Sequence, residues 1–328
     1  RGDLMLTTLK NAFKIKDIRN RLLFTLVMLV VIRFGSQLPV PGVNRTYFAD
    51  WFAAQSNGAF NFFDAFTGGS FMNMSVFALN ITPYITSSII MQLLTIAIPK
   101  LEEMQQEGED GRKKITAITR YVTIFLAVIE SLGLVIGFDR GHYMTVTGPL
   151  GYLLVIITLT TGSAFVMWLG ERVTEKGVGN GISIILLINI VSRMPSDFSD
   201  LYTKFMKGQD IVDQVIAGAI ILAVILVTTI LVVLLQGGVR KIPVQHAQKV
   251  QGRRMMGGQQ SHIPLKVNTS SVIPVIFASS ILSVPMVVVN LFNINTSGVW
   301  AKILRGMNSN YWFNPAYPWA SVGLIIYI

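Results

Sequence analysis

The chain contains no cysteine, and only three of its 328 residues are histidine. The absence of cysteine excludes disulfides, thiolate nucleophiles and thiolate metal sites. Charge is also scarce: Asp, Glu, Lys and Arg make up 13% of the residues, whereas soluble domains carry roughly 25%. With 52% hydrophobic residues and a mean hydropathy of +0.55, the composition predicts a chain that is solvated largely by lipid.

Long apolar runs recur through the whole sequence. A helix that spans a bilayer needs about 20 mostly apolar residues. The fifth run is too short unless it recruits the Gly-rich stretch Gly177–Gly181 before it, and an eighth begins near Trp319, where the chain stops. We therefore expect an all-α polytopic membrane protein with spans at Leu22–Leu38, Val76–Ile98, Thr119–Phe138, Leu150–Leu169, Ile182–Met194, Val215–Leu235 and Val272–Phe292.

One loop has no acidic residue at all. The 33 residues Gln236–Asn268 carry six Lys or Arg, and they lie between two of the longest apolar runs. Basic loops between membrane spans stay on the cytoplasmic side. With the N-terminus inside, the inner segments hold 19 Lys and Arg and the outer ones hold 8. The charge pattern thus predicts a cytoplasmic N-terminus and a large anionic partner on that side.

The predicted outer loop Asn44–Ser75 is rich in phenylalanine, and Gly68-Gly69 interrupts it. Such a segment is not stable in water, and it is too interrupted to span. Irregular backbone at membrane depth requires burial in protein or a cavity to line. The residues alone leave two interpretations equally open: an element that folds back into the protein, or an outer cap packed on helix ends.

Two of the spans share a local pattern. Ile81-Thr-Pro83-Tyr-Ile85 with Ser87-Ser88 resembles Ile273-Pro274-Val-Ile276 with Ser279-Ser280. Proline near the start of a span marks a joint, and the serine hydroxyls can bond across a close helix contact. Matching interrupted spans that run in opposite directions predict an inverted internal repeat around a central pathway.

No motif for catalysis or metal binding is present, so we expect neither an enzyme nor a cofactor. The Gly177–Gly181 run lacks the lysine and the preceding strand of a phosphate loop, and it is expected to start a helix. Glu130 is the only acidic residue deep inside a predicted span, which makes it a functional candidate. Without a cationic partner, it is expected to form a hydrogen bond within the helix bundle.

Several motifs, in order along the chain, resemble the bacterial SecY family. The resemblance runs from about Leu9 to Ile328. The residues that carry it are Leu38-Pro39-Val-Pro41-Gly42, Ile81-Thr-Pro83-Tyr-Ile85, Gly177-Val-Gly179-Asn-Gly181-Ile-Ser183, Gln251-Gly-Arg253-Arg254 and Ile263-Pro-Leu-Lys-Val-Asn268 with Ile273 to Ser280.

The resemblance implies a channel subunit of the Sec protein translocon in the bacterial inner membrane. Family members translocate unfolded polypeptides across the membrane and release transmembrane segments sideways into lipid. Two inverted halves, here residues 1–194 and 195–328, would surround a central hourglass pore. Family members have ten spans, so the chain is expected to be a fragment that ends in the eighth.

The resemblance also implies functional residues. The pore ring would be Ile81, Ile85, Leu186, Ile190 and Ile276. A plug at about residues 59–73 would contain Phe60, Phe62, Phe63 and Phe66, which favours the first interpretation of the outer loop. The lateral gate would include Thr86, Ser87, Gln92, Ser279 and Ser280. The docking surface in the basic loop 236–268 would include Arg240, Lys241, Lys249, Arg253 and Arg254.

The implied partners are the small membrane subunits SecE and SecG, the SecA motor, the ribosome, signal sequences, nascent polypeptides and lipid. Within the basic loop, Ile242-Pro-Val and Ile263–Val267 are expected to form extended arms, with Arg253-Arg254 at the tip and the turn at Met255–Gly258. Two other functions are an ion-coupled secondary transporter, which needs paired intramembrane charges, and a membrane-embedded hydrolase, which needs catalytic groups within spans. Neither explains the basic loop.

Overall fold

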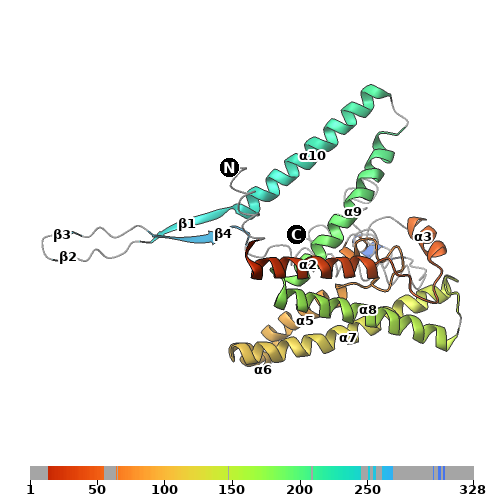
Figure 1. Cartoon of the computed structure of the whole chain (residues 1–328), viewed down its shortest axis with the longest axis horizontal. Coiled ribbons are helices and arrows are strands. Elements are labelled where there is room, and N and C mark those ends of the chain that lie inside the picture. The colour runs from red at the N-terminus through yellow and green to blue at the C-terminus, as the bar shows by residue number, and fades with distance from the viewer. Residues whose placement is uncertain are drawn as a thin grey trace. The chain divides into compact units, whose positions relative to one another are not determined.

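The computed structural model describes residues 14–54, 64, 66–146, 148–207, 210–244, 250–251, 254–255, 261–268, 298, 302–303 and 306. The fold is mainly helical (Figure 1). The chain divides after Pro195 into two compact units. The first unit contains α2 (Lys16–Gly35), α3 (Arg45–Ala54), α5 (Thr82–Ala97), α6 (Pro99–Gln106), α7 (Glu109–Arg140), α8 (Pro149–Lys176) and most of α9 (Gly181–Phe205). The second contains α10 (Ile211–Gly237), β1 (Val239–Val244), β2 (Val250–Gln251), β3 (Arg254–Met255) and β4 (Ser261–Lys266).

Four helices among the described residues are long and apolar enough to cross a membrane, namely α7, α8, α9 and α10. Helices α5 and α6 meet this criterion only as a pair, bent by 102°. Helix α2 coincides with the first predicted span, but every 18-residue stretch of it contains Arg19, Arg21 and Arg33, so it is too charged to meet the criterion. The predicted seventh span and the start of the eighth lie outside the described residues.

The second predicted span begins later than its hydrophobicity indicated. Residues 76–81 form turns, and α5 starts only at Thr82. Asn80 has a φ of 48°, a left-handed conformation that interrupts any helix before it. Pro83 then lies in the first turn of α5, where its missing N–H has no intrahelical partner to lose. A second proline, Pro99, starts α6 just after the bend.

The fifth span is longer than predicted, and it gains most of its length at its C-terminal end. Helix α9 has 25 residues and extends past Pro195 to Phe205, whereas it does not recruit the glycines before Gly181. Gly177 follows the end of α8, and Gly179 has a φ of 68°, so these residues form a turn between the two helices. Only Gly181, the last residue of the motif, belongs to α9, so a helix starts at the end of the motif as expected.

Helix α8 packs against both α2 and α7, and it brings small residues to its contacts. Gly162, Ser163 and Gly170 are buried along it. A Cβ atom on Gly162 would lie 2.0 Å from the carbonyl oxygen of Val76, so the turn before α5 rests directly on the α8 backbone. Small residues at such sites let helices approach closely where no hydrophobic effect drives them together.

The outer loop after α2 is largely buried in its described parts, and this burial is compatible with both interpretations that the sequence left open. Its first part forms α3, whose Phe48 is fully buried and stacks edge-on against Phe71 and Phe138, with ring centroids 5.7 and 5.2 Å apart. This part therefore packs on helix ends as a cap. Among the later residues, Phe71 and Met74 are 3% and 1% exposed and belong to the same apolar cluster as Phe48.

The second unit consists of one helix and a two-stranded ribbon, which we define as strands β1 and β4 with their extension β2–β3. Helix α10 is apolar around its whole circumference, and its most apolar stretch has no buried residue among those described. A helix that is hydrophobic all round is typical of a membrane span. The ribbon continues from α10, and Figure 1 shows β2 and β3 at its far end.

Candidate functional site

The residues expected to form the pore ring come together in part. Ile81, which precedes α5, is 1% exposed and lies in a cluster of apolar side chains. Ile85, one turn later, and Leu186, on α9, pack against the same cluster. Ile190 is 44% exposed, and Ile276 lies outside the described residues. The described apolar residues thus meet at the junction of α5 and α9, with Ile81 fully enclosed.

Sequence reasoning missed several members of this cluster. It draws residues from four helices and the turn before α5, and its other buried members are Ile32, Phe77, Val166, Leu169 and Ile185. Every one of them lies in a continuously apolar stretch, so hydrophobicity could not distinguish the residues that face the cluster from those that face lipid. Only the packing of the helices identifies them.

Part of the predicted plug is described, and it is buried. We call Asp64 together with residues 66–75 the outer segment. Its polar residues Thr67, Ser70 and Ser75 are at most 1% exposed, while Phe66 is partly buried. Phe60, Phe62 and Phe63 lie outside the described residues. The described part therefore folds into the first unit, which satisfies the requirement that irregular backbone at membrane depth be enclosed by protein.

The outer segment lies directly against α9. Gly68 has a φ of 66°, and a Cβ atom there would be 2.8 Å from the carbonyl oxygen of Asn189 and 2.9 Å from its Cα. A glycine is required at this position for both its conformation and its close approach. Asn189 itself is fully buried, with no hydrogen bond to its side-chain amide among the described residues.

Side chains from neighbouring elements satisfy the backbone of the outer segment. The amide of Asn80 donates to the carbonyl oxygen of Thr67 at 3.3 Å, and the Asn80 carbonyl oxygen accepts from the hydroxyl of Ser163 on α8 at 3.0 Å. Arg33 on α2 donates to the carbonyl oxygen of Gly68 at 3.4 Å. Asp64, fully buried, forms an ion pair with Arg193 of α9. Helices α2 and α9 therefore hold this stretch by direct polar contacts, and α8 contributes through Asn80.

The α5 residues expected at the lateral gate have different surroundings. Ser87 is fully buried, and its hydroxyl lies 2.5 Å from the hydroxyl of Thr123 on α7. Ser87 belongs to the face of α5 that packs on α7. Thr86 is partly buried and Gln92 is exposed, so these two lie off that face. Ser279 and Ser280 lie outside the described residues.

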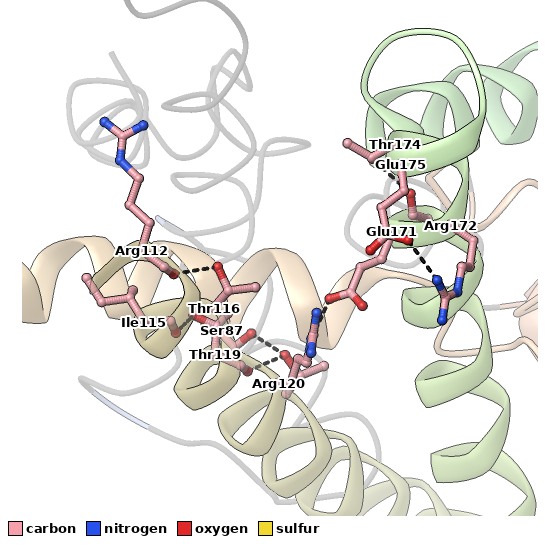
Figure 2. A network of polar contacts seen from close by, with 12 residues as sticks. Ser87, Arg112, Ile115, Thr116, Thr119, Arg120, Glu171, Arg172, Thr174 and Glu175 are labelled. Atoms are coloured by element: carbon pink, nitrogen blue, oxygen red, sulfur yellow. Dashed lines mark hydrogen bonds and ion pairs between the residues drawn. The ribbon is translucent and has the colours of Figure 1, made fainter. Parts of the chain in front are cut away.

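Polar contacts also join α7 to α8 at the end of the first unit near the α8–α9 turn. Figure 2 shows Arg120 of α7 reaching Glu171 of α8, with Nε and Oε1 2.7 Å apart. Ser87 and Thr119 lie beside it in the same network. Arg172 pairs with Glu175 at 2.7 Å, both partly exposed. Exposed pairs of this kind contribute about 0–1 kcal/mol, and only the Arg120–Glu171 pair joins the two helices.

The turn between α8 and α9 is fixed by hydroxyl groups. Thr25 of α2 accepts a hydrogen bond from the N–H of Val178 at 3.2 Å, and Thr174 of α8 accepts one from the N–H of Gly181 at 2.9 Å. The side chain of Asn180 accepts from the N–H of Ile182 at 3.0 Å and so caps α9. These bonds set the position of α9, and with it Leu186 and Ile190.

The ribbon has two chemically different faces. Cross-strand neighbours share a face, and the register pairs Lys241 with Pro264, and Ile242 with Ile263. One face therefore carries Lys241, Lys266 and His262 with the two prolines, and the other is mainly apolar. The residues of the apolar face are Arg240, Ile242, Val244, Ser261, Ile263 and Leu265.

The prolines also protect the edges of the ribbon. The N–H of Val267 donates to the carbonyl of Gly238 at 3.0 Å, and such bonded pairs recur at every second position of an antiparallel ladder. Pro243 and Pro264 therefore occupy the positions whose N–H would point outward. Each strand lacks one donor on its free edge, which discourages the addition of a further strand. The ribbon is suited to docking through its faces.

The tip of the ribbon differs from the prediction in one detail. The expected extended arms are confirmed as β1 and β4. However, Gln251 pairs with Arg254, so the chain reverses between these two residues and not at Met255–Gly258. Arg254 therefore borders the reversal. Lys249 and Arg253 lie outside the described residues, and only the backbone of Arg254 is described.

Glu130 has no hydrogen bond to its buried Oε2 among the described residues, so the predicted bond within the bundle is not seen for that atom. Its neighbour Ser131 instead lies within 3.3 Å of Thr160 on α8, hydroxyl to hydroxyl. The α7–α8 contact therefore has a polar link at this level that does not involve the carboxylate.

The family model and the similar proteins point to the same family. A family model described as SecY matches residues 75–328. The translocase subunit SecY of Halalkalibacterium halodurans is 43% identical over 293 residues, which cover 88% of this chain and 67% of that protein. The SecY subunit of Staphylococcus carnosus is 40% identical over 332 residues, covering 99% of this chain and 73% of that protein.

Solved structures share the fold. A protein-conducting channel matches with a TM-score of 0.60 at 20% identity, over 94% of this chain and 68% of that one. Sec61 in a canine ribosome–channel complex from the endoplasmic reticulum matches with a TM-score of 0.59 at 20% identity, over 94% and 69%. A SecY structure described as having a plug domain that stabilizes the closed channel matches with a TM-score of 0.56 at 19% identity, over 94% and 68%.

Proposed function

The chain belongs to the SecY family of protein-conducting translocation channels, and we propose how its residues seal, open and dock that channel. It is a multi-pass membrane protein and a channel, not an enzyme. The family match decides against the alternative of an ion-coupled secondary transporter. The two halves, residues 1–194 and 195–328, are proposed to surround the pore as inverted repeats.

We propose that Ile81, Ile85, Leu186, Ile190 and Ile276 form the ring that seals the resting pore. The observation that carries this is the apolar cluster in which Ile81, Ile85 and Leu186 meet. Bulky aliphatic side chains at a narrow waist leave water and ions without a polar partner. Ile85→Ser together with Leu186→Ser should raise the ion conductance of the idle channel in planar bilayers. Leu187→Ser, at a neighbouring position that is 60% exposed, is the matched control.

We propose that residues 59–73 form the plug. The support is the burial of their described part and its contacts with α2 and α9. A disulfide between Phe66→Cys and Ile276→Cys should block translocation until it is reduced. If this pair never crosslinks in the resting channel, while a pair across the β1–β4 ribbon does under the same oxidant, the segment is only an outer cap.

We propose a lateral gate in which Thr86 and Gln92 of α5 face Ser279 and Ser280 of the seventh span. Ser87 would support the gate indirectly, since its hydroxyl contacts Thr123 of α7. A disulfide between Gln92→Cys and Ser279→Cys should prevent the release of transmembrane segments into lipid. Secretion of a fully soluble passenger protein is the control. It should continue if only the gate is locked, and it should stop if the channel is misfolded.

We propose that the ribbon docks the SecA motor and the ribosome through Arg240, Lys241, Lys249, Arg253 and Arg254. The support is that the ribbon is strongly basic and exposed, and that a proline removes an outward N–H donor from each of its edges. Arg253→Glu with Arg254→Glu should weaken binding to both partners most at low salt, because phosphates and carboxylates pair with arginine electrostatically. Lys204→Glu with Lys207→Glu, the same charge change on a predicted outer loop, should leave docking unchanged. Wild-type affinity of the arginine variant across a salt series would leave the pair with a topological role only.

We propose a location in the bacterial inner membrane with the N-terminus in the cytoplasm. The support is the division of Lys and Arg between the two sides, 19 to 8. Small membrane subunits of the SecE and SecG kind are proposed to cover part of the apolar helix surface, of which α10 is the most exposed described example. Labelling of single cysteines from either side of the membrane tests the orientation.

A further inference from the structure

One buried ion pair links the outer segment to α9. Arg193 pairs with Asp64, whose side chain is fully buried, whereas the arginine side chain is 19% exposed. Asp64 Oδ1 also accepts hydrogen bonds from the N–H of Met72 at 2.9 Å and from the hydroxyl of Thr67 at 3.4 Å. The carboxylate is therefore the centre around which the outer segment folds, and its charge is balanced by another element.

Arg193 lies on the same side of α9 as the proposed ring residues. It follows Leu186 by seven positions and Ile190 by three, and residues at these spacings share one helix face. Asn189, against whose backbone Gly68 packs, belongs to this face as well. A single face of α9 thus carries an apolar stretch at the proposed waist, and then a cation that holds the segment.

A charge pair in a dry site behaves differently from one in water. Removing one partner leaves an uncompensated buried charge, which is strongly destabilising, whereas replacing both with neutral groups of similar volume is often tolerated. In water the same pair contributes little, because both ions are solvated. The attraction between Asp64 and Arg193 is therefore strong when the surrounding site is closed and dry, and weak once water has entered.

We propose that Asp64 and Arg193 form a charge latch that holds the outer segment on α9 in the closed channel and loosens when the pore becomes wet. Such a latch and the closed state reinforce each other, since closure excludes water and the exclusion of water strengthens the attraction between the two charges. It also makes the open state persist while a hydrated polypeptide occupies the pore. This inference rests on the proposal that the outer segment belongs to the plug.

The test compares single and double neutral variants in the full-length channel. Asp64→Asn and Arg193→Gln should each raise the idle conductance in planar bilayers by about tenfold or more, because each leaves one unpaired buried charge. The double variant should return close to the wild-type conductance, because neither charge remains. Arg45→Gln removes another arginine that contacts the same segment, at Asn73, but from an exposed position, and it should change the conductance little.

Conductance increases that multiply in the double variant, or single variants that conduct like the wild type, would overturn the latch. Deletion of residues 59–73 separates this outcome from failure of the plug proposal. If the deletion raises the leak while the single variants do not, the plug stands and the latch falls. If neither raises the leak, both fall.

A second measurement covers variants that insert poorly. A cysteine at Phe66 should react with a membrane-impermeant maleimide more readily in the single variants than in the double variant. Asp64→Glu and Arg193→Lys keep both charges and should label at an intermediate rate. Equal labelling of all these variants contradicts the latch regardless of how much protein reaches the membrane.

Discussion

The outer segment and the ribbon both lie outside the long helices, yet their side chains differ in exposure to solvent in opposite ways. In the outer segment, Thr67 and Ser75 are fully buried although they are polar. In the ribbon, Ile242 and Ile263 are 40% and 52% exposed although they are apolar. Burial of a connecting segment in this protein therefore does not follow the polarity of its residues.

The reason is the environment of the backbone. A turn that other parts of the protein enclose must find partners for its N–H and C=O groups within the protein, and hydroxyl, amide and charged side chains supply several of them. The ribbon satisfies its backbone by strand pairing and water, so its side chains are free to present a surface. Polar residues in the outer segment are thus structural, and apolar residues in the ribbon are available for binding.

The largest effect on stability is expected at the contact between Gly162 of α8 and Val76, the residue that follows the outer segment. Gly162→Ala places a methyl group about where the carbonyl oxygen of Val76 lies, and overpacking against backbone costs roughly 1–3 kcal/mol. The midpoint of thermal unfolding in detergent should fall clearly. Gly133→Ala on α7, where a Cβ atom meets nothing within 4 Å, is the matched control and should not lower it.

The next effect separates backbone conformation from hydrogen bonding at Asn80. Asn80→Ala loses both the amide bond to Thr67 and a side chain that tolerates a φ of 48°, so a loss of about 2 kcal/mol is expected. Asn80→Gly loses the bond but keeps the conformation, and it should be affected less. Equal unfolding midpoints for the two variants would contradict a role for the left-handed turn.

In the ribbon, substitution of an exposed residue should change the stability of the protein very little. Ile263→Ser is expected to shift the free energy of unfolding by less than about 0.5 kcal/mol, as exposed substitutions usually do. It should nevertheless weaken motor binding at all salt concentrations, because it removes apolar contact area. Lys241→Ser, on the opposite face, should weaken binding mainly at low salt. Identical salt profiles would show that the two faces do not act separately.

The smallest effect concerns the free edge of β4. Pro264→Thr restores an outward N–H, so a slight increase in self-association of purified channels is expected. Leu265→Thr changes a residue whose N–H already faces β1, and it serves as the control. Crosslinking in detergent, followed by gel electrophoresis, measures both. An increase of the same size in both variants would point to altered solubility and not to the edge.

Much of the architecture could be predicted from local patterns in the sequence. Apolar runs located the helices, and the prolines at positions 83 and 99 coincide with the observed helix starts. The extended arms of the basic loop were also correct. The exact ends were not, since the late start of α5 depends on the left-handed turn at Asn80, and α9 continues beyond its apolar run, through Pro195, to Phe205. Hydrophobicity alone does not encode either.

The sequence by itself determined the lipid-solvated class of the protein, its predicted orientation and the position of its basic loop, because composition, run length and charge are local properties. The tertiary structure alone decided that Asp64 meets Arg193, that Ile81 is enclosed and that Gly68 rests on Asn189. These contacts join residues far apart in the chain. They form only when the helices pack closely, because close packing fixes the neighbours of each residue. No periodicity in the sequence records that packing.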